Sequence, residues 1–191
     1  MIKMLLSISC LALAGNSYAI EEQLSDASIE VASAAYTPQF LDDKGNTIAG
    51  SIATIEQVVL GGVEQRIVIR GKDTTKPVLL MLHGGPGGPL IPFIKLLHTD
   101  ELEESFIVVQ WDQRGAGASY SDSLTEDDMQ VEKFVEDTKS LTNHLRARFK
   151  QDKIFMLGHS WGSALGFMTI TKYSELYHAY IGAGEAADWS K

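Results

Sequence analysis

The sequence predicts an α/β fold: a mostly parallel sheet with an antiparallel hairpin at its N-terminal side. In the second half of the chain, short and nearly continuous apolar runs alternate with segments of helical periodicity. Such runs are typical of strands buried on both faces of a parallel sheet that helices cover. Before them, two strand-like stretches flank a pair of glycines, which indicates a hairpin. Antiparallel strands followed by strand–helix alternation favour a single α/β sheet.

The hairpin is expected to consist of strands over residues 51–60 and 63–70, joined at Gly61 and Gly62. In the second strand, mostly apolar residues at odd positions alternate with mostly charged residues at even positions. This alternation predicts one face packed on the core and one face turned to water.

The remaining elements follow from apolar periodicity. Further strands are expected at 77–82, 106–111, 154–157 and 179–183. Apolar residues three and four apart predict a helix over 131–149, and a second helix is expected over 162–173. Thr125 and Asp128 have the spacing of a capping box at the start of the first helical region.

The composition is that of a globular chain. Of 191 residues, 45% are hydrophobic and 21% charged, and a chain of this length can bury a core without metals or disulfides. Acidic residues outnumber basic ones 25 to 16, for a formal net charge of −9. This balance disfavours nucleic acid as a partner, because that affinity rests on Lys and Arg neutralising phosphates. A single cysteine, Cys10, excludes a disulfide framework and a cluster of thiolate metal ligands.

The N-terminus has the pattern of a secretory signal peptide over residues 1–19. A positively charged start precedes a mostly apolar stretch, and small residues stand at the −3 and −1 positions of a cut after Ala19. We therefore expect a secreted or periplasmic protein. An N-terminal lead-in is expected over 20–50 and the α/β core over 51–191, and no later segment is apolar enough for a stable membrane span.

The segment Gly158-His159-Ser160-Trp161-Gly162 is a G-x-S-x-G motif between an expected strand and an expected helix. A serine hydroxyl is a poor nucleophile unless it is held exposed and delivered to a base. A tight strand-to-helix turn exposes it, and the turn requires both glycines because a Cβ there would collide with neighbouring backbone. The first N–H groups of the helix also favour developing negative charge. The motif therefore predicts Ser160 as a nucleophile.

A second glycine-rich segment, His83 to Pro89, directly follows the strand at 77–82. Glycine at this density lets backbone N–H groups approach a ligand closely. Beside a G-x-S-x-G motif, such a loop is expected to supply one N–H group of an oxyanion hole, and the other would be that of Trp161. His83 itself is expected to be a structural hydrogen-bonding residue rather than a base.

A third segment, Asp112 to Ser119, follows the strand at 106–111. We expect Asp112 and Arg114 to pair with each other and to hold this glycine-containing loop together near the site, rather than to act in catalysis.

The phrases HGGPGG, WDQRGAGAS and GHSWGS, in this order and spacing, resemble the α/β-hydrolase superfamily and, within it, the proline iminopeptidase group of serine peptidases. The resemblance covers about residues 50–184. It implies an α/β-hydrolase fold, with Ser160 as the nucleophile and Gly85 and Trp161 as the oxyanion-hole donors. The residues expected to support this site are His83, Gly84, Asp112, Arg114, Gly158 and Gly162. The implied reaction releases an N-terminal proline through an acyl-enzyme, with no metal and no organic cofactor. A serine at this turn also argues against branches of the superfamily that use an aspartate there, such as epoxide hydrolases.

We expect neither an acid nor a histidine after Ser160 in this sequence to complete a catalytic triad with it. In this fold an Asp or Glu and then a His follow the nucleophile along the chain. Here Glu185 and Asp188 come after His178, which is the only histidine beyond Ser160. The resemblance further implies a helical cap and more core strands after residue 183. We therefore expect the N-terminal portion of a hydrolase, C-terminally truncated before the cap and the last core strands.

The other histidines do not supply a base in the expected fold. His98 and His144 lie in or beside amphipathic segments and are expected at the surface, while His159 is tied to the turn beside Ser160.

Two alternatives stay open. The first is an esterase-type small-acyl hydrolase, because substrate specificity is expected to lie mostly in the cap. The second is a catalytically inactive fragment, because an open sheet edge favours instability and aggregation. The expected partner is a peptide or a small acyl substrate. No surface helix indicates an interface, so the oligomeric state stays open.

Overall fold

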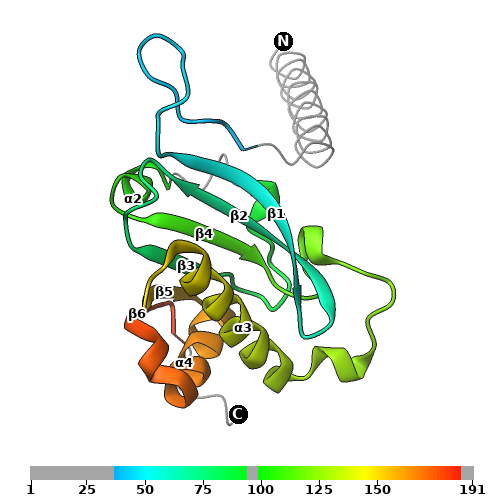
Figure 1. The fold of residues 1–191 in the computed structure, drawn as a ribbon. Coiled ribbons are helices and arrows are strands. Elements are labelled where there is room, and N and C mark those ends of the chain that lie inside the picture. The colour runs from blue at the N-terminus through cyan, green and yellow to red at the C-terminus, as the bar shows by residue number, and fades with distance from the viewer. Residues whose placement is uncertain (1–36, 94–98, 186–191) are drawn as a thin grey trace, which may run out of the picture. The chain divides into compact units, whose positions relative to one another are not determined.

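Six strands form one mixed sheet in the order β1-β2-β4-β3-β5-β6 (Figure 1). The computed structural model describes residues 37–93 and 99–185. The expected signal peptide, the first part of the lead-in, His98 and Asp188 therefore lie outside the described residues.

The N-terminal hairpin is confirmed. β1 (Ile52–Leu60) and β2 (Val63–Gly71) pair in antiparallel orientation. Gly61 and Gly62, at the turn, have φ angles of +54° and +80°, which glycine adopts without steric cost. Any residue with a Cβ at these two positions would therefore be strained.

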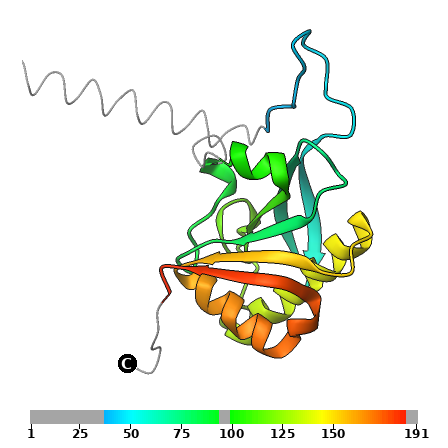
Figure 2. The same ribbon diagram turned by 90° about the vertical axis from the view of Figure 1, so that its left-hand side faces the viewer.

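The parallel part of the sheet is confirmed as well. β3 (Val78–Leu82) lies between β4 (Ile107–Asp112) and β5 (Ile154–His159) and is parallel to both. β6 (Tyr177–Ala183) pairs with β5 in parallel and forms the edge of the sheet (Figure 2). Because parallel strands end on the same side of a sheet, the loops that follow β3, β4 and β5 are neighbours. These are the three loops that carry the sequence motifs.

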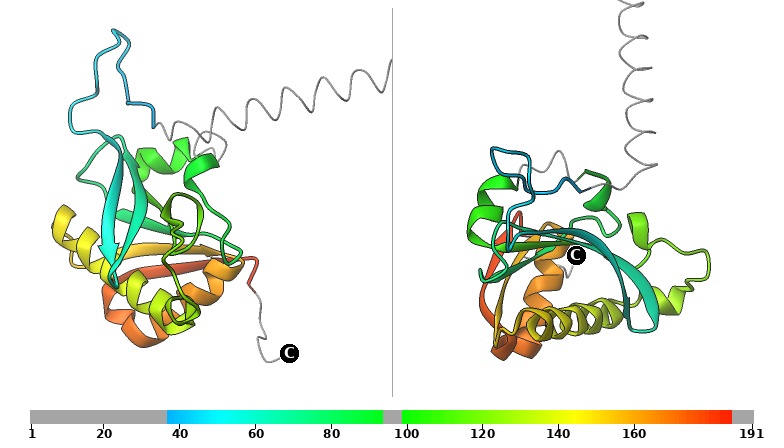
Figure 3. Two further views of the ribbon diagram at one scale, coloured as in Figure 1. Left: turned by 90° about the vertical axis from the view of Figure 1, so that its right-hand side faces the viewer. Right: turned by 45° about the horizontal axis from the view of Figure 1, so that its top comes forward.

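Two long helices cover one face of this sheet, α3 (Val131–Phe149) and α4 (Trp161–Tyr173) (Figures 1 and 3). The strand side chains on that face pack with the helices into one buried core. Its members include Ile67, Leu80, Val109, Leu141, Met156 and Leu165. Both predicted helices are therefore present at their predicted places.

The shorter helical segments fall between these elements: η1 (Ile91–Phe93), α2 (Asp100–Ser105), η2 (Gly117–Ser119), η3 (Glu126–Met129) and η4 (Ser174–Leu176). Thr125 and Asp128 do form a capping box, but it caps η3. The long helix α3 begins after Gln130, which has an extended backbone and provides no side-chain cap. The expected cap is thus real but belongs to a separate turn.

The expected water-exposed face of β2 is wrong for the second half of the strand. Val68 and Arg70 are both buried, because α2 and the end of the lead-in cover that face. The Arg70 guanidinium donates to the Glu103 carboxylate of α2 (Nε–Oε1, 2.8 Å) and to the Thr37 hydroxyl (Nη1–Oγ1, 2.6 Å). A buried charge needs such partners, and these lie too far along the chain for strand alternation to reveal them.

Among the described residues, no helix combines the length and the apolarity that crossing a bilayer requires.

Candidate active site

Ser160 occupies the turn between β5 and α4 in a strained backbone conformation. Its φ and ψ angles are +52° and −118°, a combination that costs free energy for any residue with a Cβ. Hydrogen bonds hold the turn from both sides. The Ser160 N–H donates to the Ala183 carbonyl (2.9 Å), and the Ser160 carbonyl accepts from the N–H and the hydroxyl of Ser163 (2.8 and 2.6 Å). The end of β6 and the first turn of α4 therefore keep the serine in this position.

The glycines two residues before and after Ser160 leave no space for a side chain. A Cβ on Gly158 would lie 2.2 Å from the Gly162 carbonyl oxygen. A Cβ on Gly162 would lie 2.2 Å from the carbonyl oxygen of Leu82, the last residue of β3. Both clashes involve backbone, which cannot rotate away. The turn can therefore pack against β3 only with glycine at both positions.

The loop after β3 lies directly against the serine. A Cβ on Gly84 would be 3.2 Å from the Ser160 Cβ. The next residue, Gly85, has a φ of +118°, and a Cβ there would lie 2.5 Å from the Gly87 nitrogen. The Gly88 N–H closes the loop by donating to the Gly84 carbonyl (3.1 Å). The loop thus brings backbone close to Ser160 because glycines form it.

His83 is a buried hydrogen-bonding residue and does not contact the serine hydroxyl. Its Nε2 accepts the Gln113 backbone N–H (3.0 Å), so its Nδ1 carries the proton and donates to the Gly84 carbonyl (2.8 Å). Burial lowers the pKa of His83 below the ordinary value of 6.5, against smaller opposing effects of the Gly84 hydrogen bond and of Asp112. The neutral ring therefore ties the start of the glycine loop to the loop after β4.

Asp112 and Arg114 do not pair with each other, so this expectation is wrong. The Asp112 carboxylate instead accepts three backbone N–H groups: those of Leu90 and Ile91 on Oδ1 (2.7 and 3.0 Å) and that of Ala118 on Oδ2 (2.9 Å). Backbone donors satisfy this buried carboxylate. Asp112 thereby joins the loop after β3 to the loop after β4.

Arg114 forms a buried ion pair with Asp137 of α3. Its Nε and Nη2 donate to the two oxygens of that carboxylate at 2.7 and 2.8 Å, and both side chains are 1% exposed. The Gln65 amide also donates to Asp137 (2.6 Å) and accepts the indole N–H of Trp111 (2.9 Å). This network fixes the loop after β4 to the hairpin and to α3. Arg114 therefore has a structural role, but its partner Asp137 lies outside the motif.

Gln113, between Asp112 and Arg114 in the chain, is a site residue that was not predicted from the sequence. It is fully buried. Its side-chain oxygen accepts the indole N–H of Trp161 (3.0 Å), and its side-chain nitrogen donates to the His83 carbonyl (3.4 Å). Its position directly after a buried strand and inside the motif is the sequence feature that could have identified Gln113 as a site residue.

The described histidines do not supply a base to Ser160. In the described ranges, the hydrogen bonds of Ser160 involve its backbone alone. His159 is exposed beside Gly84, and His144 is exposed on α3. His178 stacks on Phe155 with 5.1 Å between ring centroids, near the start of β6 and so at the end of the strand opposite to Ser160.

Glu175 is a further acid that was not considered as a triad member from the sequence. Glu175 also follows Ser160 and precedes His178, which is the chain order of the triad. It is exposed in η4, before β6 begins, and therefore lies at the same distant end as His178. This pair does not serve Ser160 either.

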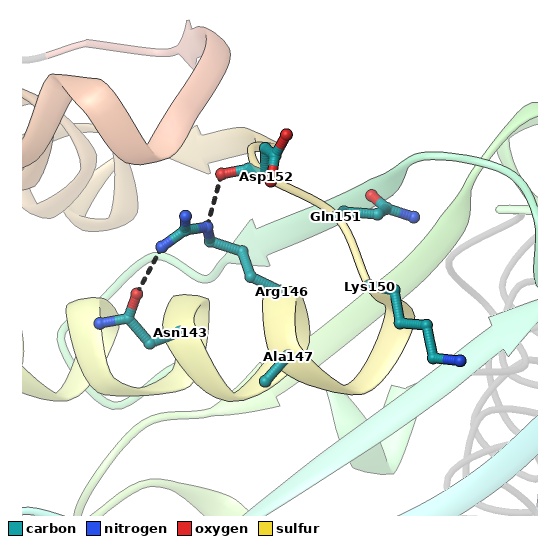
Figure 4. Close-up of a pocket in the computed structure, with 6 residues that line it drawn as sticks. All are labelled: Asn143, Arg146, Ala147, Lys150, Gln151 and Asp152. Carbon is teal, nitrogen blue, oxygen red and sulfur yellow. Dashed lines mark hydrogen bonds between the residues drawn. The ribbon is translucent and has the colours of Figure 1, made fainter.

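A surface depression lies elsewhere, at the C-terminal end of α3 (Figure 4). It is lined by Asn143, Arg146, Ala147, Lys150, Gln151 and Asp152. The Arg146 guanidinium is already engaged, because it donates to the Asn143 side chain (2.8 Å) and the Asp152 carbonyl (2.6 Å). Within residues 37–93 and 99–185, no three His, Cys, Asp or Glu side chains gather where they could hold a metal ion.

The sheet order, the covering helices and the serine turn after β5 define an α/β-hydrolase fold. Residues 95–190 match the family described as serine aminopeptidase, S33. The chain belongs to this family of hydrolases.

Curated relatives carry related names. The probable aminopeptidase YbaC of Bacillus subtilis is 38% identical over 138 residues, which are 72% of this chain and 43% of that protein. The proline iminopeptidase of Lactobacillus acidophilus is 33% identical over 115 residues, or 59% of this chain and 36% of that protein. The chain thus spans less than half of the length of these relatives.

Solved structures agree on the fold. The proline iminopeptidase-related protein TTHA1809 from Thermus thermophilus superposes with a TM-score of 0.58 at 26% identity, covering 69% of this chain and 44% of that one. An epoxide hydrolase from Vigna radiata superposes with a TM-score of 0.56, but at 21% identity. At that identity the likeness extends to the fold alone.

Proposed function

We propose that this chain carries the nucleophile and the oxyanion hole of a serine hydrolase of the proline iminopeptidase type. The observation that carries the proposal is the backbone of Ser160, with φ of +52° and ψ of −118° at the turn between β5 and α4. Strain of this kind persists only where the surrounding structure imposes it, and it clusters at functional sites. It is also the geometry that a G-x-S-x-G turn needs to expose its hydroxyl.

In this proposal the Ser160 hydroxyl attacks the carbonyl carbon of the substrate. The hydroxyl proton passes to a general base, the carbonyl oxygen becomes an oxyanion, and the N–H groups of Gly85 and Trp161 donate to it. When this intermediate collapses, the bond to the leaving amine breaks, the amine takes the proton from the base, and an acyl-enzyme remains. The position of Trp161 as the first residue of α4 supports this role, because helix N-termini stabilise negative charge. Each such donor typically contributes roughly 10²- to 10³-fold in rate.

The general base and its acid are proposed to lie outside the described residues. Neither His178 nor His144 approaches Ser160, and the relatives are more than twice as long as the matched segment. Without a base, attack by the serine is slow, and an acyl-enzyme persists because no group activates the water that would release it. Ser160 without such a base is therefore expected to be acylated slowly, and its acyl-enzyme to be hydrolysed more slowly still.

The proposed substrate is a peptide with an N-terminal proline, as in the relatives named proline iminopeptidase. An activated prolyl aryl ester tests this class without relying on a base, because its leaving group departs easily. We expect intact-mass measurement to detect one prolyl adduct per chain. Because substrate specificity is expected to lie mostly in the cap, the free and N-acetylated esters are compared on a chain that includes the helical cap implied by the resemblance, where acetylation of the prolyl amine should slow adduct formation. Equal loading there would favour the esterase-type alternative, and no adduct on the folded chain described here would favour an inactive fragment.

The proposed site of action is outside the cytoplasm, after cleavage behind Ala19. Mass spectrometry of the N-terminus of the protein recovered from its native host tests this proposal. An N-terminus at Ile20 supports export, and an N-terminus at Met1 contradicts it.

A further inference from the structure

We propose that Gln113 is a positioning residue that sets the separation of the two oxyanion-hole donors. The inference rests on the proposed roles of Gly85 and Trp161. One donor lies in the loop after β3 and the other at the start of α4, so they belong to different segments of the chain. Gln113, in the loop after β4, contacts both segments through hydrogen bonds.

The contact to α4 goes through the side chain of Trp161. The indole Nε1–H donates to the Gln113 Oε1 at 3.0 Å. The indole also packs edge-on against Phe134 of α3, with 5.8 Å between ring centroids. The indole N–H is a directional donor on a rigid ring. Fixing it also fixes the Cα of Trp161, and with it the first N–H of the helix.

The contact to the glycine loop goes through His83. The Gln113 backbone N–H donates to the His83 Nε2 at 3.0 Å, and the Gln113 Nε2 donates to the His83 carbonyl at 3.4 Å. Gly84 and Gly85 follow directly in the chain. His83 and Gln113 are 2% and 0% exposed, so water does not compete for these bonds.

The side-chain amide is suited to this position because it accepts and donates at once. Its oxygen serves the indole and its nitrogen serves the carbonyl. A methionine of similar length offers neither group but leaves the backbone N–H to His83 in place. Gln113→Met therefore removes the connection between the two donor segments while keeping the volume filled and the His83 tautomer unchanged.

The chain offers a matched control. Gln65 accepts the indole N–H of Trp111 at 2.9 Å, and both residues are fully buried. This second glutamine–indole pair lies in the hairpin and β4 and touches neither donor segment. Gln65→Met therefore removes this bond together with the donation of the Gln65 amide to Asp137 (2.6 Å), and neither lost bond involves a donor segment.

The first measurement uses ¹⁵N–¹H spectra of the folded chain. Gln113→Met is expected to shift the backbone amides of Gly84, Gly85 and Trp161, and Gln65→Met is expected to leave them in place. Trp161→Phe removes the same hydrogen bond from its other side and should move the Gly84 and Gly85 amides too, which covers the case of a poorly folded Gln113→Met. Unmoved Gly84 and Gly85 amides, or equal movement in Gln65→Met, would overturn the proposal.

The second measurement is the rate of adduct formation with the prolyl aryl ester. Gln113→Met should slow it about 10-fold, since misplacing a donor loses part of the roughly 10²- to 10³-fold that a donor supplies. Gln65→Met should stay within about twofold of the unmodified chain. Equal rates in the two variants would overturn the positioning role. Absence of any adduct on the unmodified chain would contradict the proposed function instead, while the amide spectra would still decide the role of Gln113.

Discussion

Gly162 at the start of α4 and Leu82 at the end of β3 approach so closely that a Cβ on Gly162 would lie 2.2 Å from the Leu82 carbonyl oxygen. This contact packs the start of α4 against the end of β3, which the glycine-rich loop follows. It therefore places Ser160 and the loop after β3 beside each other, which neither segment does alone.

This contact predicts a large cost for Gly162→Ala. Neither backbone can move aside without disturbing the sheet, so we expect a loss of about 3 kcal/mol or more in the free energy of unfolding. Urea denaturation followed by circular dichroism measures it. Gly84→Ala is the matched control, because its Cβ would meet the Ser160 side chain at 3.2 Å. That variant should stay much more stable yet acylate more slowly. Similar free energies of unfolding for the two variants would contradict the proposed importance of the contact between Gly162 and Leu82.

The strain at Ser160 predicts an unusual order of stability. Ser160→Ala keeps the Cβ at a φ of +52°, whereas Ser160→Gly removes it. We expect Ser160→Gly to be more stable than Ser160→Ala by about 1 kcal/mol, after the entropic cost of glycine. At Ser163, inside α4, the order should reverse by about 1 kcal/mol because glycine is a poor helix former. Chemical denaturation of the four variants measures both differences in the free energy of unfolding, and alanine more stable than glycine at both positions would rule out strain at the turn.

The Arg114–Asp137 pair predicts strong destabilisation when one partner is removed. Asp137→Ala would leave a buried guanidinium and the Gln65 amide without their acceptor, at a cost of about 3–5 kcal/mol. Lys172→Ala removes the exposed ion pair with Glu136 and should have a far smaller effect. Comparable midpoints of urea unfolding for both variants would show that the buried pair contributes little.

His83 predicts a pH dependence of stability. Its pKa in the folded chain is lowered from 6.5, chiefly by burial, so the unfolded chain binds the proton more readily. The stabilisation is therefore complete above the unfolded value and is lost as the pH falls through 6.5 toward the lower folded value. Between roughly pH 7 and pH 5, the free energy of unfolding should fall by up to about 1.4 kcal/mol per pH unit from this group. His83→Gln should flatten that slope, and an unchanged slope would exclude His83 as its source.

The sequence was sufficient for the parts of the site that are local. Glycine spacing around Ser160 and the apolar runs before each motif predicted the turn, the strands and the neighbouring loops, because these depend on residues close in the chain. The partners of Arg114 and Arg70 could not be predicted in this way. Asp137 and Glu103 reach them only through the packing of α3 and α2. Gln113 was missed for the same reason, since both its partners lie on other loops.

Mapping the acyl adduct tests the central claim most directly. The folded chain is incubated with the prolyl aryl ester, digested and sequenced by mass spectrometry. We expect the adduct on Ser160 and its loss in Ser160→Ala. It should be retained in Ser163→Ala, which removes only the hydroxyl that donates to the Ser160 carbonyl. An adduct that persists in Ser160→Ala, or that maps to another residue, would contradict the assignment of Ser160 as the nucleophile.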